Sequence, residues 1–462
     1  MSTSNPATRA IADFVADLTY DRIPGEVIAR IKLLMLDALG CALFGTGLEW
    51  SRILLRTLAR LDRSPACAVW GTAQRLSAPH AALANGTLVQ SFELDDVHRA
   101  GVLHVGAVTL PPLLAVVELR GGMTGRDFLT AAVAGYEVGP RVGLCMGPEH
   151  IGQGWHSGAT VGVFSAAAGA AAALRLPSSK TVHAFGIAGT QAAGLMAAQY
   201  GAMVKRMHAG RAAQSGLYGA LLAEAGFTGI TDVFESPYGG FCTTFSRSQD
   251  RFDLSQLTAG LGERFETMNI ALKFYACVGS NHTTLDALRE IQLRRTFAPD
   301  EVKGIVIHAS QATVDHAGWP YVPTSLTAAQ MNLPFCVATL LVAGDAFVGE
   351  FDDAAVGDPR RVALARKVEV RHDPAITARG AKFRHMVCVE VHLSDGSRHE
   401  ETVEAPRGSE RKFASEGEVV AKFAKLSRRA LTEGQADRLV ELVLDCDKLD
   451  DVGLLTRALA LP

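Results

Sequence analysis

The sequence predicts a mostly α-helical protein, with a large all-helical domain and a smaller α+β domain. Apolar residues recur at helical spacing through roughly the first 225 of the 462 residues, and no convincing strand interrupts them. Alternating, β-branched segments appear only beyond Ala271, and two amphipathic helical segments follow near the C-terminus. The predicted division is a helical domain at 1–270, an α+β domain at 271–405, and C-terminal helices at 406–462 that can rejoin the helical domain.

The helical domain begins with two predicted helices within residues 7–44. Ile11, Phe14 and Leu18 share one face of the first helix, and Pro24 stands at the start of the second. The apolar spacing that follows is again helical. Further helices are predicted at 51–61, 78–92, 110–119, 126–146, 157–176, 178–198 and 208–225.

Two stretches of this region, Gly158–Leu174 and Thr181–Val204, are long and uncharged. A membrane-spanning helix needs about 20 predominantly apolar residues. Because both stretches are rich in Ala and Gly, we interpret them as buried helices of a soluble protein that pack closely through small residues. No membrane partner is expected.

The α+β domain is predicted from four strand-like segments. The last two flank Ser394–Ser397, a turn sequence, and so predict a hairpin. A linker is expected at 406–411. The predicted strands are 302–310, 368–372, 386–393 and 398–404, and the predicted helices are 283–293, 327–343, 359–365, 416–431 and 433–446.

Composition narrows the class of protein. Hydrophobic residues make up 48% and charged residues 20%, which supports a large core and argues against disorder. The net charge of −3 gives no basic face, so nucleic acid is not an expected partner. Eight scattered cysteines without a CxxC pair indicate buried free thiols. Asp13 and Asp17 interrupt the first apolar run, which is not a signal peptide, and a cytoplasmic protein is expected.

The most unusual stretch is Ser91–Pro111, which concentrates acids and imidazoles beside an apolar run. Such groups are costly to bury unless paired, and clusters of them are common where pKa values are tuned. The alternative is a solvated loop with two surface histidines. The stretch could supply an acid/base pair or metal ligands, although it lacks HExxH and a cysteine pair. Its candidate residues are Glu93, Asp95, Asp96, His98 and His104.

A second candidate is His156, which lies between glycines at the start of the Ala-rich helix. A helix N-terminus offers free N–H groups and partial positive charge, so it can receive a carboxylate. The alternative is an ordinary helix cap in which Ser157 or Thr160 supplies the oxygen.

A third candidate is the positive cluster that follows the second uncharged stretch. Lys205, Arg206, His208 and Arg211 lie within seven positions there. A cation that emerges from an apolar segment suits an anionic ligand, whereas the alternative is a solvated helix start.

The fourth candidate is residues 273–282, at the change of domain, because binding sites often lie between domains. Cys277 is a conceivable nucleophile, but a buried thiol fits its surroundings better. The sequence has no GxGxxG after a strand in its first half, no GxxxxGK[ST] and no GxSxG, which counts against dinucleotide use, phosphoryl transfer and the hydrolase elbow.

Together these stretches resemble the MmgE/PrpD family, which includes 2-methylcitrate dehydratase, cis-aconitate decarboxylase and iminodisuccinate epimerase. The resemblance covers nearly the whole chain. The order and spacing of seven segments carry it: SFELDDVHRAGVLH, GYEVGPRVG, GWHSGATVGVFSAAAGAAA, VKRMHAGRAAQSG, GFTGITDVFE, KFYACVGSNHTTLDAL and AQMNLPFCVATLLVAGD.

The resemblance implies a homodimer without metal or organic cofactor. It implies a helical domain, an inserted α+β lid, and an active site in the cleft between them. Asp95 and Asp96 match the family's DD pair, and Glu93 stands where Asp is usual. His104, His156 and Lys205 resemble the family's two histidines and its lysine, with His208 beside them.

The chain departs from the family pattern in stretches that face substrate, so the departures bear on the substrate more than on the fold. Val97 replaces the threonine of DDTHP, and Val105–Gly106 replaces the end of HPS. Phe335 takes the place of a tyrosine common in the lid helix, and Ala276–Ser280 replaces a PCCRY-like turn.

We therefore expect a cofactor-independent lyase, of the dehydratase type, acting on a small di- or tricarboxylic acid such as 2-methylcitrate. His104 and His156 would serve as base and acid in an order left open, and Lys205 would hold a carboxylate with help from His208. Asp95 or Asp96 would orient an imidazole. The expected catalytic set is His104, His156, Lys205 and Asp96, and the expected substrate-binding set is Glu93, Asp95, His98, His208, Cys277 and Phe335.

Three alternatives stay open at this stage. The same groups could support a cis-aconitate-type decarboxylase or a dicarboxylate epimerase, because each reaction passes a carbanion-like centre beside carboxylates. A non-catalytic carboxylate-binding protein is a second alternative, which the Val97 and Phe335 departures favour slightly. A metal-dependent enzyme is the third.

Overall fold

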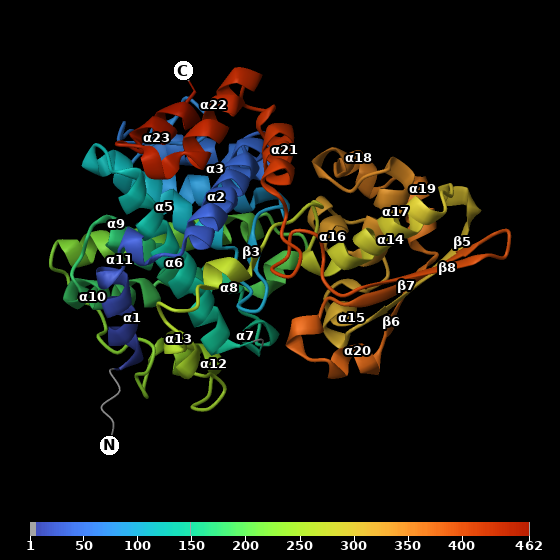
Figure 1. Ribbon diagram of the computed structural model, residues 1–462, viewed down its shortest axis with the longest axis horizontal. Coiled ribbons are helices and arrows are strands. Elements are labelled where there is room, and N and C mark those ends of the chain that lie inside the picture. The colour runs from blue at the N-terminus through green and yellow to red at the C-terminus, as the bar shows by residue number, and fades with distance from the viewer. Residues whose placement is uncertain (1–5, 148, 462) are drawn as a thin grey trace.

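The computed structural model describes residues 6–147 and 149–461, and Figure 1 shows a larger helical body beside a smaller body built on a sheet. The mostly α fold with a smaller α+β portion is as predicted. The N-terminal helices are α1 Ala7–Asp17, α2 Gly25–Gly45, α3 Glu49–Leu61, α4 Ala78–Val89, α5 Val105–Arg120, α6 Gly125–Met146, α7 Glu149–Gly152, α8 Ser157–Thr160, α9 Gly162–Ala173, α10 Ser178–Gly189, α11 Val204–Glu224, α12 Phe241–Ser246 and α13 Ser255–Thr258.

The smaller body contains a four-stranded sheet of order β6-β5-β7-β8. β5 pairs in parallel with β6 and antiparallel with β7, and β7 and β8 form the predicted hairpin. α14 contacts β7 and β8, and α17 contacts β6, so these helices cover the sheet. The elements are α14 His282–Arg294, β5 Val302–Ala309, α15 Gln311–Ala317, α16 Leu326–Met331, α17 Leu333–Ala343, α18 Asp353–Val356, α19 Pro359–Ala365, β6 Val368–His372, α20 Pro374–Ala378, β7 Val387–Leu393 and β8 Arg398–Val403.

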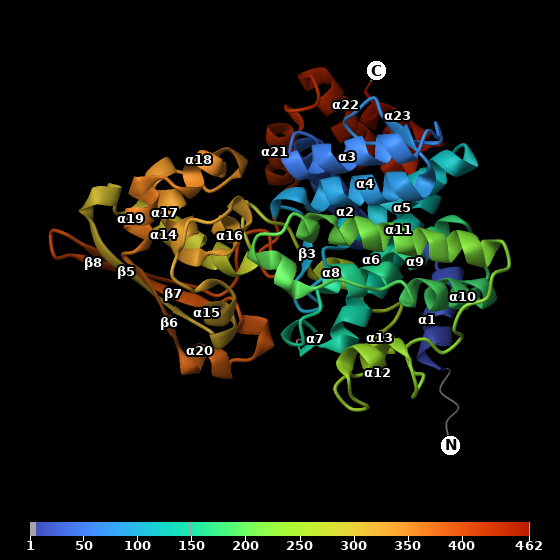
Figure 2. The same cartoon turned by 180° about the vertical axis from the view of Figure 1, so that it is seen from behind.

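The last helices, α21 Glu416–Ser427, α22 Glu433–Leu444 and α23 Gly453–Leu459, return to the helical body. α21 and α22 pack against α2, and in both views the three helices lie beside the N-terminal helices rather than beside the sheet (Figures 1 and 2). The N-terminal and C-terminal helices therefore belong to the same body.

Two short strand pairs help to place the site. β1 Cys67–Ala68 pairs with β2 Arg75–Leu76, and β3 Val97–His98 pairs antiparallel with β4 Ile270–Ala271. The second pair fastens the acidic stretch to the segment where the chain leaves the helical body.

The chain crosses between the bodies twice, and the two crossing segments touch. The Leu272 N–H donates to the Gly408 carbonyl at 2.9 Å. Gly408 has φ +84°, and a Cβ there would lie 2.4 Å from the Leu272 oxygen, so only glycine fits. The two crossing segments are thus hydrogen-bonded to each other at the junction of the bodies.

Several predicted helix bounds were wrong for local reasons. α5 starts at Val105 rather than at 110, because Asp96 accepts the Gly106 N–H at 2.9 Å and caps its first turn, and Pro111 and Pro112 lie inside the helix. The helix predicted at 327–343 is two helices, since Asn332 accepts the Phe335 N–H and starts α17.

The prediction that Thr181–Val204 is one buried helix was also wrong. α10 ends at Gly189, and the chain then crosses the start of α8, where Gly194 accepts the His156 N–H at 3.1 Å. A Cβ at Gly194 would lie 2.2 Å from Ala159, so this crossing needs glycine. By contrast, α9 is buried over nearly its whole length, as expected.

No helix in the described part of the chain is long and apolar enough to cross a membrane. All eight cysteines are free, and seven of them are buried.

Candidate active site

The Glu93 carboxylate lies at the centre of a buried cluster of cations. Its Oε1 accepts hydrogen bonds from Lys205 Nζ and, at 2.8 Å, from Arg206 Nη1, while Lys273 Nζ lies 3.4 Å from Oε2. All four side chains are almost completely buried. Three positive charges against one negative charge leave this cluster a net charge of +2, which a bound polyanion would balance.

The excess of positive charge around Glu93 lowers the pKa of its carboxyl group. Burial alone would raise the pKa of Glu93, but the charges of Lys205, Lys273 and Arg206 outweigh it and hold that pKa well below its ordinary value. Burial lowers the pKa of Lys205, against the opposing charge of Glu93. Glu93 also has φ 57°, a left-handed conformation that costs a non-glycine residue roughly 1–2 kcal/mol. Such strain at a buried charge cluster favours a functional role.

His104 is held by Asp95 on the same loop. His104 Nδ1 lies 2.9 Å from Asp95 Oδ2, and the Asp95 side chain is fully buried. Because the carboxylate accepts only, Nδ1 carries the proton, and Nε2 is the atom left for chemistry. The His104 side chain is 12% exposed, which gives a ligand limited access to it. Of the two acids considered, Asp95 is the one that orients an imidazole.

His156 and His208 face each other. Their Nδ1 atoms lie 3.1 Å apart and their ring centroids 4.9 Å apart. Burial, then Lys205, lowers the pKa of His208 to about 4, and burial with Lys205, His208 and His104 lowers the pKa of His156 well below its ordinary value. Both rings are therefore neutral near pH 7, and one Nδ1 donates to the other, so the two rings are opposite tautomers.

These groups come together at the starts of helices. His104 precedes α5, His156 precedes α8, and Lys205 lies in the first turn of α11. His156 lies within electrostatic reach of both Lys205 and His104, although the three are far apart in the sequence. The long helices α5 and α11 point their positive ends at the cluster and add to its attraction for anions.

The lid body closes the cluster through Arg206. Arg206 Nη2 donates to Gln330 Oε1 of α16 at 2.9 Å, while Nη1 holds Glu93. Gln330 Nε2 in turn donates to the Phe92 carbonyl at 3.1 Å and to the Ala276 carbonyl at 2.8 Å. One amide thus joins the lid, the acidic loop and the crossing segment, and the site lies between the two bodies.

Asp96 faces away from this cluster. Its Oδ1 takes the Gly106 N–H, and the Tyr136 hydroxyl adjoins it. Burial, followed by the charge of Asp95, raises the pKa of Asp96 to about 8. The neutral carboxyl caps α5 and so supports the loop that carries His104.

Three other predicted site residues have partners elsewhere. His98 uses both ring nitrogens, since Nε2 lies 3.1 Å from Glu266 Oε2 and Nδ1 accepts the Gly101 N–H. Cys277 is fully buried, and burial raises its pKa well above the ordinary value, which opposes a nucleophilic thiolate. Phe335 stacks on Tyr321 inside the lid at a centroid distance of 4.3 Å. Their predicted contact with substrate stays a prediction.

The contacts decide between the alternatives considered earlier for the start of α8, an ordinary side-chain cap, and for the start of α11, a solvated helix end. No side-chain oxygen caps α8; Thr160 Oγ1 instead lies 2.7 Å from His150 Nε2. Lys205, Arg206 and His208 are buried rather than solvated, whereas Arg211 is exposed and bonds to Gln214.

Sequence reasoning missed Lys273 and did not use Arg206. The signal for Lys273 is a lone lysine in the apolar run of residues 270–278. A single cation in such a run is buried only when a carboxylate meets it, and the partner is 180 residues away.

Within residues 6–147 and 149–461, no group of three or more His, Cys, Asp or Glu side chains is arranged to hold a metal ion.

The fold and the site define a two-body, mostly helical protein whose buried centre suits a small polyanion. Family models agree with this description. The model of the MmgE/PrpD N-terminal domain matches residues 9–253, and that of the MmgE/PrpD C-terminal domain matches residues 275–448. The chain belongs to the MmgE/PrpD family.

Relatives of known name match over nearly the whole chain. The cis-aconitate decarboxylase-like protein oryM of Aspergillus oryzae is 35% identical over 96% of this chain and 95% of its own length. The cis-aconitate decarboxylase of Aspergillus terreus is 33% identical over 98% of this chain and 96% of its own length. The cis-aconitate decarboxylase of Homo sapiens is 26% identical over 98% of this chain and 95% of its own length.

Proposed function

We propose that the protein is a lyase that removes CO₂ from cis-aconitate or a closely similar unsaturated tricarboxylate. The observation that carries the proposal is the buried Glu93 cluster, where three cations meet one carboxylate beside the oriented His104 imidazole. The names of the relatives support decarboxylation. They favour this alternative over 2-methylcitrate dehydration, the main expectation from the sequence.

The chemistry of the substrate explains the need for these groups. Cis-aconitate carries one carboxylate on a methylene group next to its carbon–carbon double bond. When the bond to that carboxylate breaks, CO₂ leaves and its electron pair enters an allylic system that extends into a second carboxylate. A proton added at the far carbon then gives an unsaturated dicarboxylate, so the reaction consumes one proton and releases one CO₂.

We propose separate roles for the residues that bind the carboxylates, supply the proton and line the site. Lys205, Lys273 and Arg206 hold the carboxylates that stay and stabilise the negative charge that develops on them. His104 takes up a proton from solvent on Nε2, while its Nδ1–H stays bonded to Asp95, and it then delivers the Nε2 proton to the far carbon. The neutral His156–His208 pair lines the other side and can donate one hydrogen bond to a carboxylate.

An NMR assay with a panel of acids tests this proposal. The enzyme is incubated separately with cis-aconitate, 2-methylcitrate, citrate and an amino-dicarboxylate. We expect loss of CO₂ from cis-aconitate alone, and no turnover by His104→Ala with its fold intact. Dehydration of 2-methylcitrate would instead restore the first hypothesis. Full activity of His104→Ala would remove His104 from the mechanism, and binding without turnover of any acid would favour a carboxylate-binding protein.

We also propose that the protein is a homodimer in a reducing compartment such as the cytoplasm. Several large apolar side chains just before and within α11 are exposed: Leu195, Tyr200, Met203, Val204, Tyr218 and Leu222. A second copy that covers them would bury apolar surface beside the site. The free cysteines fit the compartment. Domain bounds near 270 and 405 likewise stay our proposal.

A further inference from the structure

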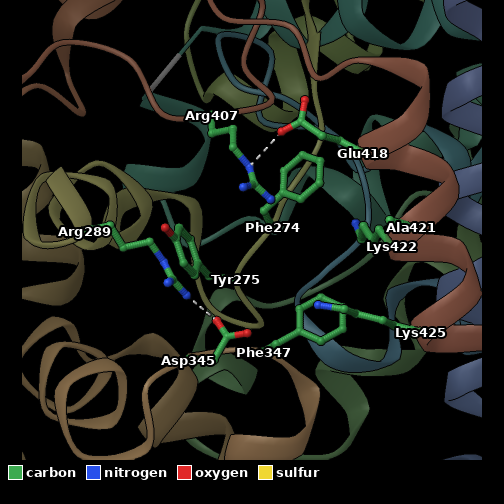
Figure 3. Close-up of a pocket in the computed structure, with 10 residues that line it drawn as sticks. All are labelled: Phe274, Tyr275, Arg289, Asp345, Phe347, Arg407, Glu418, Ala421, Lys422 and Lys425. Carbon is green, nitrogen blue, oxygen red and sulfur yellow. Dashed lines mark hydrogen bonds and ion pairs between the residues drawn. The ribbon is translucent and has the colours of Figure 1, made fainter. Parts of the chain in front are cut away.

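A cavity lies at the junction of the two bodies (Figure 3). Its volume is about 330 Å³, within the range of small-ligand pockets. Its walls come from α14, from the loop that follows α17, from the two crossing segments and from α21. None of the residues of the Glu93 cluster lines it.

The cavity is lined by four cations. In Figure 3, Arg289 reaches in from the lid side, while Lys422 and Lys425 extend from α21 on the opposite side. Arg289 is paired with Asp345 at 2.6 Å, and Arg407 with Glu418 at 3.5 Å. Each of these pairs is partly exposed, so it can open to accept another anion at little cost.

Lys425 differs from the other three. Among the described residues it has no carboxylate within ion-pair distance, and its Nζ lies 5.6 Å from the centre of the Phe347 ring. Lys422 is paired with Asp37, which lies outside the cavity. Among the lining residues themselves, four cations face only two carboxylates, Asp345 and Glu418, so the walls are net positive. Asp286, outside the lining, accepts hydrogen bonds from the Tyr275 hydroxyl and the Arg407 N–H.

We propose that this hinge cavity binds a small polyanion of phosphate or carboxylate chemistry, separate from the substrate. Such a ligand would contact Lys425 of the helical body and Arg289 of the lid at once, and so would hold the two bodies together. Lys422 connects the cavity to the active site, because its Nζ donates at 2.8 Å to the carbonyl of Leu94, the residue between Glu93 and Asp95. The inference goes beyond the proposed reaction and does not depend on it.

Calorimetric titration tests the site. Inorganic pyrophosphate and citrate are titrated separately into the native protein, Lys425→Glu and Lys273→Met, the last of which removes a cation of the Glu93 cluster and leaves the lining of the hinge cavity unchanged. We expect a binding event that persists in Lys273→Met, and the anion that shows it identifies the chemistry. Lys425→Glu should weaken that binding at least ten-fold, whereas Lys303→Glu, an exposed lysine on β5, should not change it.

Three outcomes would overturn the proposal: no binding of either anion to the native protein, equal affinity in Lys425→Glu, or binding that is lost in Lys273→Met. A melting curve provides an independent measurement, since a ligand that joins the bodies raises the melting temperature of the native protein but not of Lys425→Glu. None of these readouts needs turnover, so failure of the proposed reaction would be seen separately.

Discussion

Glu93 and Asp95 stand two positions apart on one loop, yet they have different tasks. Glu93 is held among three cations and keeps them in place without neutralising them. Asp95 meets one imidazole and fixes which nitrogen faces the cluster. Asp96, the next residue, caps a helix. In our proposal, Glu93 positions the cations that attract the substrate, and Asp95 orients the acid that protonates it.

Asp95→Asn is expected to lower kcat for cis-aconitate by about 10²–10⁴-fold, because a correctly placed general acid contributes that much. KM should change little, since Asp95 does not touch the cations. Asp96→Asn is the matched control and should keep most of the activity, because Asp96 is already neutral near pH 7. Equal losses in the two variants would show that the loop as a whole, not the His104–Asp95 pair, is responsible.

Asp96 should also make stability depend on pH. Its folded pKa of about 8 lies above the ordinary value of 3.8, so the folded protein binds this proton more tightly than the unfolded chain. The resulting stability is complete below about pH 4 and is lost as the pH rises through 8, with a slope of at most about 1.4 kcal/mol per pH unit. In urea unfolding between pH 6 and 9, Asp96→Asn should lose less stability than the native protein. Parallel curves would contradict this account.

At the scale of elements, helix starts and crossing segments determine the site. Strands with alternating burial, such as β6, β7 and β8, were predicted within one residue because period-two patterns are local. The helices from α1 to α6 were also found, although α5 begins earlier than predicted. Errors occurred where a distant group decides the local structure, as with Asp96 at the start of α5 and Gly194 against Ala159.

The candidate site, like the helices and strands, could be predicted from the sequence only in part. His104, His156, Lys205 and His208 could be selected because polar residues stood out in apolar surroundings. The partners could not be assigned, because Lys273 and Gln330 reach the acidic loop from 180 and 238 residues away. Nor could the sequence decide between Asp95 and Asp96, since adjacent side chains differ only in the direction that the folded loop gives them.

Gln330→Leu tests the connection between α16 and the acidic loop. The change leaves the carbonyls of Phe92 and Ala276 without this donor, and each buried polar group without a partner costs about 1–3 kcal/mol. We expect a loss of at least about 2 kcal/mol in unfolding free energy and a KM raised about ten-fold or more. The control is Gln311→Leu on α15, an exposed glutamine whose side chain donates to Asp315 of the same helix. If both variants behave alike, Gln330 does not join the bodies.

At the scale of the whole molecule, the fold places a positive centre where two bodies meet. The first and last helices build one body and the sheet domain forms the other (Figure 2). The crossing segments, one of which carries Lys273, are joined where the Leu272 N–H donates to the Gly408 carbonyl. In our proposal a polyanion contacts cations of the helical body and of the junction at once, and the lid contacts the same cluster through Gln330. The hinge cavity is likewise lined by cations of both bodies.

The most direct measurement is the affinity of propane-1,2,3-tricarboxylate for the native protein and for Lys273→Met, determined by calorimetry on samples that unfold cooperatively. Lys303→Met, which removes an exposed lysine of β5, is the control. We predict that the affinity of the Glu93 cluster for the tricarboxylate is reduced at least ten-fold in Lys273→Met and unchanged in Lys303→Met. Equal affinity in all three proteins would contradict the claim that the Glu93 cluster is the site that holds the substrate.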